Sequence, residues 1–228
     1  MSADAKVSKT TKHHNDGFAN AANGVSAERK SMLLHSCCGP CSTAVIERLL
    51  DRYDLTVYFY NPNITNEGEY YKRLEAQKIF IDAYNKEIPE DRQIKLVEGP
   101  YDPENWLMAV KGMEEEPENG ARCTKCFEVR MRQTAEAAQE MGAETFASTL
   151  SVSPHKNTNR INDIGYVLEK EFEPDFLDES FKKKDGFRRS TEMSRQYDIY
   201  RQSYCGCIFS ERPGYGPEDP SLERRLKE

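Results

Sequence analysis

Short apolar runs alternate with longer amphipathic segments over most of the chain. The short runs, most of them rich in β-branched or aromatic residues, predict five strands, at residues 32–35, 55–60, 94–97, 145–150 and 175–177. Apolar residues at helical spacing predict helices at residues 43–52, 67–84, 123–141, 157–170 and 188–202, and Tyr101-Asp102-Pro103 opens one more. Because strands that alternate with helices are typical of a parallel sheet, we predict an α/β fold with helices on both faces of the sheet.

The two ends of the chain lack this pattern. Residues 1–30 hold few large apolar side chains, and residues 213–228 are rich in proline, glycine and charge. Segments of this composition cannot bury enough apolar surface to fold. We therefore expect a disordered N-terminal tail and a polar C-terminal tail around a single folded body at residues 31–212.

The composition limits the partners and the compartment that we expect. The net charge of −7 argues against unspecific nucleic-acid binding, although residues 182–201 hold seven basic residues against three acidic ones. No apolar run reaches the roughly 20 residues of a membrane span, and no secretory signal opens the chain. We expect a protein of the reducing cytoplasm, where seven cysteines favour metal binding or redox chemistry over a disulfide framework.

The cysteines fall into three close-spaced groups. In chain order, the groups are Cys37, Cys38 and Cys41, then Cys123 and Cys126, then Cys205 and Cys207. The first group directly follows a predicted strand, and ligand sites of parallel sheets lie at the carboxyl ends of the strands. Two cysteines three positions apart at a helix start place both sulfurs on one face, where the helix N-terminus favours the thiolate. Two such groups can supply the four thiolates that a cubane iron–sulfur cluster needs.

Other interpretations of the cysteines are open at this point. Single cysteines are commonly small buried apolar residues, and a structural zinc site with four cysteines would leave three of the seven unused. Cys38-Gly39-Pro40-Cys41 is also typical of a thioredoxin-like redox motif. The additional Cys37, the lack of a preceding tryptophan and the two further groups fit that motif poorly.

Four separated motifs resemble, in the same order, those of the epoxyqueuosine reductase (QueH) family. The motifs are Leu34-His35-Ser36-Cys37-Cys38-Gly39-Pro40-Cys41, Tyr60-Asn61-Pro62-Asn63-Ile64, Cys123-x-x-Cys126 and Tyr204-Cys205-Gly206-Cys207. Thr149-Leu150-Ser151-Val152-Ser153-Pro154-His155-Lys156 also looks like a segment of that family. The resemblance covers about residues 32–210, which is nearly the whole predicted body.

The resemblance implies a fold, an activity and partners. The fold is expected to be a Rossmann-like sheet similar to the nucleotide α-hydrolase type. The expected activity removes the epoxide oxygen of epoxyqueuosine at the wobble position of tRNA, without cobalamin and with a [4Fe-4S] cluster. The expected partners are that tRNA and an electron donor such as a ferredoxin or flavodoxin. Since cysteines stand where relatives of this fold carry a phosphate loop, ATP use is not expected. The alternative functions are a tRNA sulfur-transfer enzyme of the same fold, which would need that loop, and a zinc-stabilised binding module without chemistry.

The resemblance also assigns roles to the cysteines. The expected ligands of the cluster are Cys37, Cys38, Cys123 and Cys126. Cys205 and Cys207 are expected to form either a redox-active disulfide pair or, with Cys41, the ligands of a second, mononuclear iron. A second centre would be useful because opening an epoxide to an alkene consumes two electrons, whereas a cubane cluster normally passes one at a time.

The remaining candidate residues would donate a proton or contact the substrate. His35, two residues before the first cysteines, is a candidate proton donor, and equally a hydrogen-bonded histidine at a strand end. Tyr60, Asn61 and Asn63 follow the second strand and are candidates for contacts with the base or ribose, although Asn-Pro-Asn is also an ordinary turn sequence.

The basic segment supplies candidates for tRNA contacts. Arg188, Arg189 and Arg195 are expected to bind tRNA phosphates, because arginine pairs with phosphate in a bidentate manner. The alternative is a solvated helix face with no partner.

Overall fold

The computed structural model describes residues 29–210. Five strands form one sheet: β1 (Lys30–Ser36), β2 (Tyr53–Phe59), β3 (Lys95–Glu98), β4 (Thr145–Ser148) and β5 (Asp175–Phe176). Apart from residues 29 and 30, the two predicted tails lie outside the described residues, as do the last two residues of the predicted body. Within residues 29–210, no helix combines the length and the apolar composition that a membrane crossing requires.

The sheet is parallel throughout and its strands follow the order β3-β2-β1-β4-β5. Leu34 of β1 lies between Val57 of β2 and Ala147 of β4. The chain builds one half of the sheet outward from β1 and then returns to build the other half from β4. The order therefore reverses between β1 and β4, which is the place where α/β sheets bind ligands outside the strand ends.

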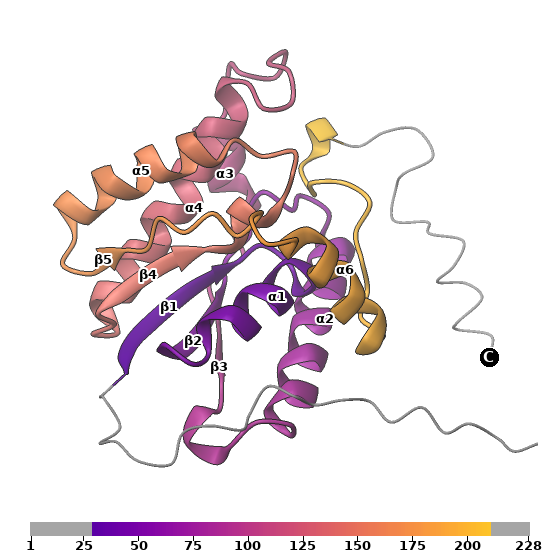
Figure 1. Ribbon diagram of the computed structural model, residues 1–228. Coiled ribbons are helices and arrows are strands. Elements are labelled where there is room, and N and C mark those ends of the chain that lie inside the picture. The colour runs from indigo at the N-terminus through magenta and orange to yellow at the C-terminus, as the bar shows by residue number, and fades with distance from the viewer. Residues whose placement is uncertain (1–28, 211–228) are drawn as a thin grey trace, which may run out of the picture.

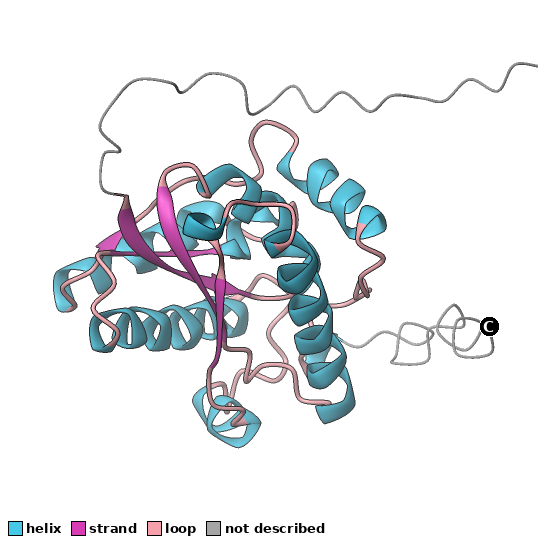
Figure 2. Ribbon diagram, turned by 90° about the horizontal axis from the view of Figure 1, so that it is seen from below, coloured by secondary structure: helices cyan, strands magenta, loops and turns pink. Residues whose placement is uncertain are grey.

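Helices cover both faces of the sheet (Figures 1 and 2). Their bounds are α1 (Gly39–Leu49), α2 (Glu67–Asn85), α3 (Pro103–Ala109), α4 (Ala121–Glu140), α5 (Thr158–Glu171) and α6 (Gly186–Gln196). Helices α1, α2 and α6 pack together on one face, while α4 packs with α5 and α3 on the other. The predicted three-layer α/β fold is confirmed, and its similarity to the nucleotide α-hydrolase type stays a prediction.

Alternate residues of the strands fill two separate parts of the core. Leu34 and Val57 belong to the apolar cluster under α1, α2 and α6, whereas Leu33 and Phe146 belong to the cluster under α4 and α5. All four side chains are buried, and each contributes about 1.5–3 kcal/mol through burial. The carboxyl ends of β1 and β4 are thus fixed by a core on both faces.

Two predicted elements end earlier than expected. The strand predicted at residues 145–150 ends at Ser148, and the chain continues in a short 3₁₀ helix, η2 (Thr149–Val152). The helix predicted at residues 188–202 is wrong in its last six residues, because α6 ends at Gln196 and Asp198 has a left-handed backbone with φ 47°. Residues 197–207 therefore form an irregular segment, named here the C-terminal strap, which carries Cys205 and Cys207.

Candidate metal centre and active site

The first cysteine group lies at the junction of β1 and α1. The sulfur atoms of Cys37, Cys38 and Cys41 all lie within 4.8 Å of one another, and those of Cys37 and Cys38 are 3.9 Å apart. Gly39 allows a close approach here, because a Cβ atom at this position would lie only 3.0 Å from the backbone of Ala76 in α2. The close approach of α1 to α2 thus sets the position of the three thiols, which together could hold a metal ion.

The three thiols of the first group differ in how readily they ionise. Hydrogen bonds from Cys38 and Cys41 hold the pKa of Cys37 well below its ordinary value. Burial and the neighbouring Cys37 raise the pKa of Cys38 to about 12, and hydrogen bonding to Cys37 and Cys38 raises the pKa of Cys41. Cys37 is therefore the first of the three to ionise. Bringing all three to the thiolate form requires the positive charge that a bound metal supplies.

Polar groups from other elements contact these sulfurs. The hydroxyl of Thr149, which follows β4, accepts a hydrogen bond from the backbone N–H of Cys37 at 3.1 Å and donates to its sulfur at 3.5 Å. The side-chain amide of Gln202, in the C-terminal strap, donates to the Cys38 sulfur at 2.8 Å. Hydrogen bonds to sulfur are among the features that orient thiolates and tune metal centres.

The second group opens α4, as predicted. The backbone N–H of Asn119 donates to the sulfur of Cys123 at 3.2 Å, and Cys126 is buried near Trp106. Burial raises the pKa of both Cys123 and Cys126 above its ordinary value, while the hydrogen bond from Asn119 acts in the opposite direction on Cys123. The predicted preference for thiolate at this helix start stays a prediction.

The third group lies in the C-terminal strap, and all seven cysteines are free thiols. Cys207 is buried with Cys126 and Trp106, and its thiol lies 3.4 Å from the hydroxyl of Ser210. The predicted disulfide between Cys205 and Cys207 is therefore not formed in this structure. Whether the two thiols act as a redox pair stays a prediction.

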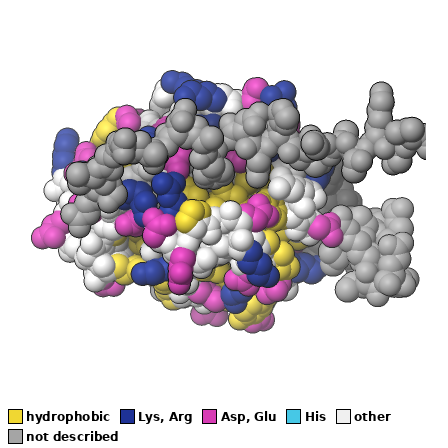
Figure 3. All heavy atoms as spheres, turned by 60° about the horizontal axis from the view of Figure 1, so that its bottom comes forward, with side chains coloured by type: hydrophobic (Ala, Val, Ile, Leu, Met, Phe, Trp, Pro, Cys, Tyr) yellow, Lys and Arg dark blue, Asp and Glu magenta, His cyan; other side chains and the backbone are white. Residues whose placement is uncertain are grey.

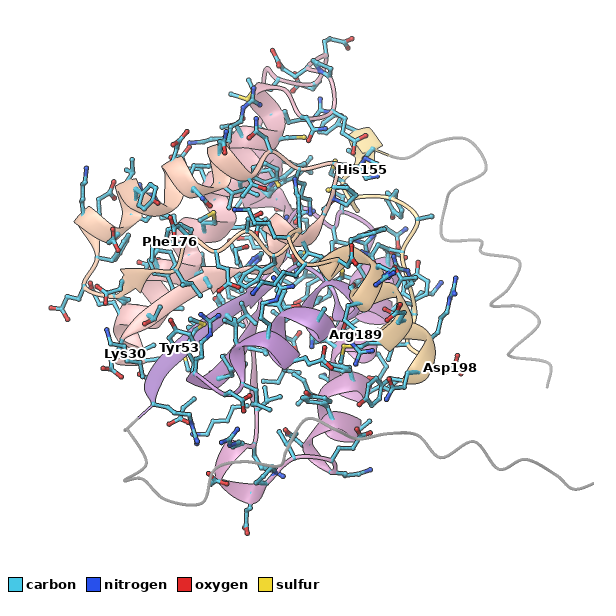
Figure 4. All side chains as sticks on the ribbon, viewed as in Figure 1. Lys30, Tyr53, His155, Phe176, Arg189 and Asp198 are labelled. Atoms are coloured by element: carbon cyan, nitrogen blue, oxygen red, sulfur yellow. The ribbon has the colours of Figure 1, made fainter. Side chains whose placement is uncertain are left out.

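One cavity of about 550 Å³ joins the three groups. Its wall includes Cys37 and Cys41 from the first group, Cys123 from the second and Cys205 from the third. Four of the seven cysteines, separated in the sequence by up to more than 160 positions, thus line a single space at the carboxyl edge of the sheet. Cys38, Cys126 and Cys207 are buried and do not line it. His155, in the loop after β4, lines the same cavity (Figure 4).

Basic side chains surround this cavity, and sequence reasoning missed them. Arg73, Arg130, Lys156 and Arg201 line it together with the thiols. Arg130 is buried and donates to the side-chain oxygen of Asn61 at 2.5 Å. Burial disfavours the charged form of Lys156, but the attraction of negative charge at Cys37 and Cys205 outweighs burial and raises the pKa of the ammonium. These cations offset the negative charge that several thiolates would bring.

Some signals for these residues were present in the sequence. Lys156 ends the segment at residues 149–156 that resembles the family. Arg73 and Arg130 lie on the buried sides of α2 and α4, among apolar residues such as Leu74 and Met131. Arginine is rarely buried without a partner or a function, so its place on an apolar helix face was the signal.

Among the residues that the structure describes, His35 is not one of those that line the cavity. Its ring is fully buried, with one nitrogen 2.8 Å from the Ser148 hydroxyl and the other 3.0 Å from the Tyr60 carbonyl oxygen. Burial and the nearby Arg130 lower the pKa of His35 to about 3, so the ring is neutral. This geometry favours the structural alternative, in which His35 ties the ends of three strands together, over the predicted role of proton donor.

Tyr60, Asn61 and Asn63 are buried and do not line the cavity either. Tyr60 stacks on Tyr58 with ring centroids 5.9 Å apart. Asn61 donates to the carbonyl oxygen of Ser36 at 2.9 Å. Their side chains thus support the loops around the site, and the predicted contacts with the base or ribose find no open surface at these residues.

The three predicted tRNA-binding arginines lie on α6 and differ in their surroundings. Arg189 is paired with Glu47 of α1, with distances of 2.6 and 2.9 Å (Figure 4). Arg188 is exposed but lies 3.0 Å from Asp185, and Arg195 is exposed with no ion pair to a described residue. On the face shown in Figure 3, basic and acidic side chains are interspersed. Arg195 is therefore the most available of the three for a phosphate.

Comparisons with known proteins agree with the motifs and cover the cavity residues. Residues 32–213 match the family model described as epoxyqueuosine reductase QueH. Three relatives bear that same name. The relative from Streptococcus pyogenes is 44% identical over 81% of this chain and 71% of its own length. The relative from Histophilus somni is 37% identical over 92% and 84%, and that from Thermotoga maritima 33% over 79% and 90%.

Proposed function

The chain belongs to the epoxyqueuosine reductase QueH family and is an oxidoreductase, and we propose that it reduces epoxyqueuosine to queuosine at the wobble position of tRNA with iron bound by its cysteines. The observation that carries this proposal is the cavity whose wall holds thiols from all three cysteine groups. Removal of the epoxide oxygen consumes two electrons and two protons, forms an alkene and releases water. A site for this reaction needs a redox centre, a proton source and room for a base.

The donor set fits an iron–sulfur centre. Three sulfurs lie within 4.8 Å of one another, a further group opens α4, and basic residues surround the space between them. We propose that the cluster ligands are Cys37, Cys38, Cys123 and Cys126. Cys41 lies beside the first group and also lines the cavity with Cys205, which suits a ligand of a neighbouring iron shared with Cys205 and Cys207. When bound, the iron centre would relay the two electrons of the reduction, which it would receive one at a time from an external carrier.

The proton source that we propose is Lys156. Its side chain lines the cavity together with Cys37 and Cys205, and a lysine ammonium carries a proton at neutral pH. Lys156 replaces His35 in this role, because the buried imidazole has both ring nitrogens occupied. We propose that the ammonium faces the epoxide oxygen and delivers a proton as the oxygen departs.

The mouth of the cavity suits a nucleotide. Phe187, at the start of α6, is exposed, and the guanidinium of Arg201 lies 5.6 Å from the centre of its ring. Both residues line the cavity. We propose that this pair receives the modified base or an adjoining phosphate of tRNA, because base stacking on aromatic rings and arginine–phosphate pairing are common modes of RNA recognition. Electrons would come from a one-electron carrier such as a ferredoxin or flavodoxin.

The cellular setting follows from the chemistry. Seven free thiols and a tRNA substrate are compatible with the reducing cytoplasm, where disulfides are rare. We therefore infer a cytoplasmic enzyme.

Single-turnover chemistry on purified protein tests the proposed function. The full chain is purified without oxygen, reduced chemically and mixed with tRNA that carries epoxyqueuosine, and the nucleosides are separated by mass. The expected result is queuosine in an amount that matches the bound iron centre, and none in a matched sample loaded with zinc. Equal conversion by the zinc-loaded sample, or no conversion by an iron-loaded one, would contradict the proposal.

A further inference from the structure

The C-terminal strap, residues 197–207, holds Cys205 at the cavity without help from regular secondary structure. It runs past the N-terminal half of α2, which begins at Glu67. Since no strand or helix fixes its backbone, side-chain contacts must decide where its thiols lie. Several of these contacts come from one buried group of residues on α2. Others come from the loop before α2, where the side-chain amide of Asn63 lies 3.5 Å from the Cys205 carbonyl oxygen.

Arg73 is the centre of that group. Its side chain is almost fully buried, and its Nη1 and Nη2 atoms donate to the backbone carbonyl oxygens of Cys205 at 3.0 Å and Tyr204 at 3.2 Å. The Arg73 guanidinium also lies 5.2 Å from the centre of the Tyr204 ring. One guanidinium thus donates hydrogen bonds to two successive residues of the strap, and its planar donors are preorganised for this.

Glu69 completes the arrangement from the preceding turn of α2. Its fully buried carboxylate accepts from Nε of Arg73 at 2.6 Å and from the hydroxyl of Tyr200 at 2.9 Å. Because Tyr200 belongs to the strap, contacts run from the strap to Glu69, from Glu69 to Arg73, and from Arg73 back to the strap. The carboxylate also orients the guanidinium toward the two carbonyl groups.

The glycine between the last two cysteines fits the same arrangement. Gly206 has φ +108°, and a Cβ atom there would lie 2.9 Å from Ile64 and 3.0 Å from Nη1 of Arg73. The Gly206 carbonyl oxygen accepts a backbone hydrogen bond from Thr65 at 3.1 Å. The Cys-Gly-Cys spacing therefore reflects both the left-handed turn and the space that Arg73 needs.

We propose that Arg73 is a positioning residue that, oriented by Glu69 and Tyr200, sets where the Cys205 thiol lies relative to the first cysteine group. A buried ion pair is weak evidence for stability, since apolar side chains of similar volume commonly replace one without loss. The Arg73 guanidinium also donates to the backbone carbonyl oxygen of Cys205, which lines the cavity, and it therefore fixes one wall of the site. The chemistry assigned to Cys205 rests on the proposed function, but its placement by Arg73 does not.

The test compares two pairs of substitutions in the full chain purified without oxygen. The double variant Arg73→Met/Glu69→Gln removes the buried ion pair without leaving one charge unpaired. The control, Arg132→Met/Glu171→Gln, removes an exposed ion pair between α4 and α5, where the two side chains are 2.5 Å apart. Arg73→Lys keeps the charge but loses the forked donors.

Amide hydrogen exchange and the rate of Cys205 alkylation by iodoacetamide are measured by mass spectrometry. In the double variant, exchange in residues 203–207 and alkylation of Cys205 are expected to rise by about tenfold or more, while exchange in β1 stays unchanged. Arg73→Lys is expected to fall between wild type and the double variant, and the control to match wild type. When the double variant is assayed with tRNA substrate, its kcat is expected to fall below that of wild type, and its KM is expected to stay within about twofold of the wild-type KM.

Unchanged exchange in residues 203–207 of the double variant would overturn the proposal, as would an equal rise over the whole fold. If the double variant does not fold, Tyr200→Phe decides, because it removes only one hydroxyl. That variant is expected to raise exchange in residues 203–207 more than in β1, and a rise there no larger than in β1 would overturn the proposal. A failure of the proposed function would show as wild-type protein that does not reduce epoxyqueuosine, which leaves the exchange and alkylation results readable.

Discussion

The candidate centre has two sides that are held in place by different interactions. On the strand side, Cys37 and Cys38 continue the central strand β1 into α1, over a core that is buried on both faces. On the strap side, Cys205 lies in an irregular segment, and Arg73 donates hydrogen bonds to two backbone carbonyl oxygens of that segment. The position of the first thiols therefore comes with the fold, whereas that of Cys205 depends on a few polar contacts.

Loss of a strand-side thiol should have the largest effect. In Cys37→Ser, we expect the protein to lose its inorganic sulfide and all turnover, because the substitution removes the sulfur that the other two thiols contact. Iron and sulfide analysis after anaerobic purification checks this, with circular dichroism as the control for folding. A brown absorbance band as strong as that of wild type would contradict the assignment of Cys37 to the cluster.

Loss of the strap-side thiol should separate metal content from turnover. In Cys205→Ser, we expect the cluster to remain while conversion of epoxyqueuosine stops, because Cys205 lines the cavity from the other side. Sulfide content and single-turnover assays on the same sample measure the two properties. If this variant were fully active, or if it lost as much sulfide as Cys37→Ser, the distinction between the two sides would fail.

The two sides should also differ in their contribution to stability. Leu34→Ala in β1 is expected to lower the free energy of unfolding by about 2–5 kcal/mol, because it leaves a cavity in the core. Tyr200→Phe in the strap removes a hydrogen bond to the charged Glu69 and is expected to cost about 1.5–3 kcal/mol. Urea unfolding measures both, and a larger loss in Tyr200→Phe would reverse the comparison.

Substitution of Lys156 tests whether the strand side and the strap side share one proton source. The Lys156 side chain lines the same cavity as Cys37 of the strand side and Cys205 of the strap side. In Lys156→Met, we expect kcat to fall by about 10² with the metal content unchanged, which is the usual size of a general-acid contribution. Lys170→Met, at the exposed end of α5, is the matched control. A kcat for Lys156→Met equal to that of the control would exclude Lys156 as the proton source.

The smallest expected effect concerns the arginines of α6. Arg195→Ala should weaken tRNA binding several-fold and reduce the slope of log affinity against log salt by about 1, as loss of one phosphate contact does. Arg189→Ala should change the slope less, because this side chain is already paired with Glu47. Titrations at several salt concentrations measure both. Equal slopes for Arg195→Ala and wild type would remove Arg195 from the interface.

The strand side could be predicted from the sequence because its determinants are local. An apolar run followed by closely spaced cysteines and Pro40 predicts a strand, a cysteine-bearing turn and a helix start, and the structure has them in that order. The repeated Cys-x-x-Cys spacing also predicted that α4 opens with thiols, and the resemblance to a family covered the same residues.

The strap side could not be predicted in the same way. The end of α6 depends on the left-handed backbone of Asp198, which apolar periodicity does not reveal. The contacts that place Cys205 join Arg73 to residues more than 130 positions away. For His35, the sequence suggested chemistry that the structure does not favour. Its place beside the cysteines predicted a proton donor, whereas its buried ring contacts the Ser148 hydroxyl and the Tyr60 carbonyl oxygen at the ends of the strands.

The central claim is that thiols from separate parts of the chain bind iron at one edge of the sheet. Iron X-ray absorption of the full chain, reconstituted without oxygen, tests it most directly. We predict a first shell dominated by sulfur and an iron–iron distance typical of a cubane cluster, both lost in Cys37→Ser. A first shell of nitrogen and oxygen, or a wild-type spectrum that Cys37→Ser leaves unchanged, would contradict the account.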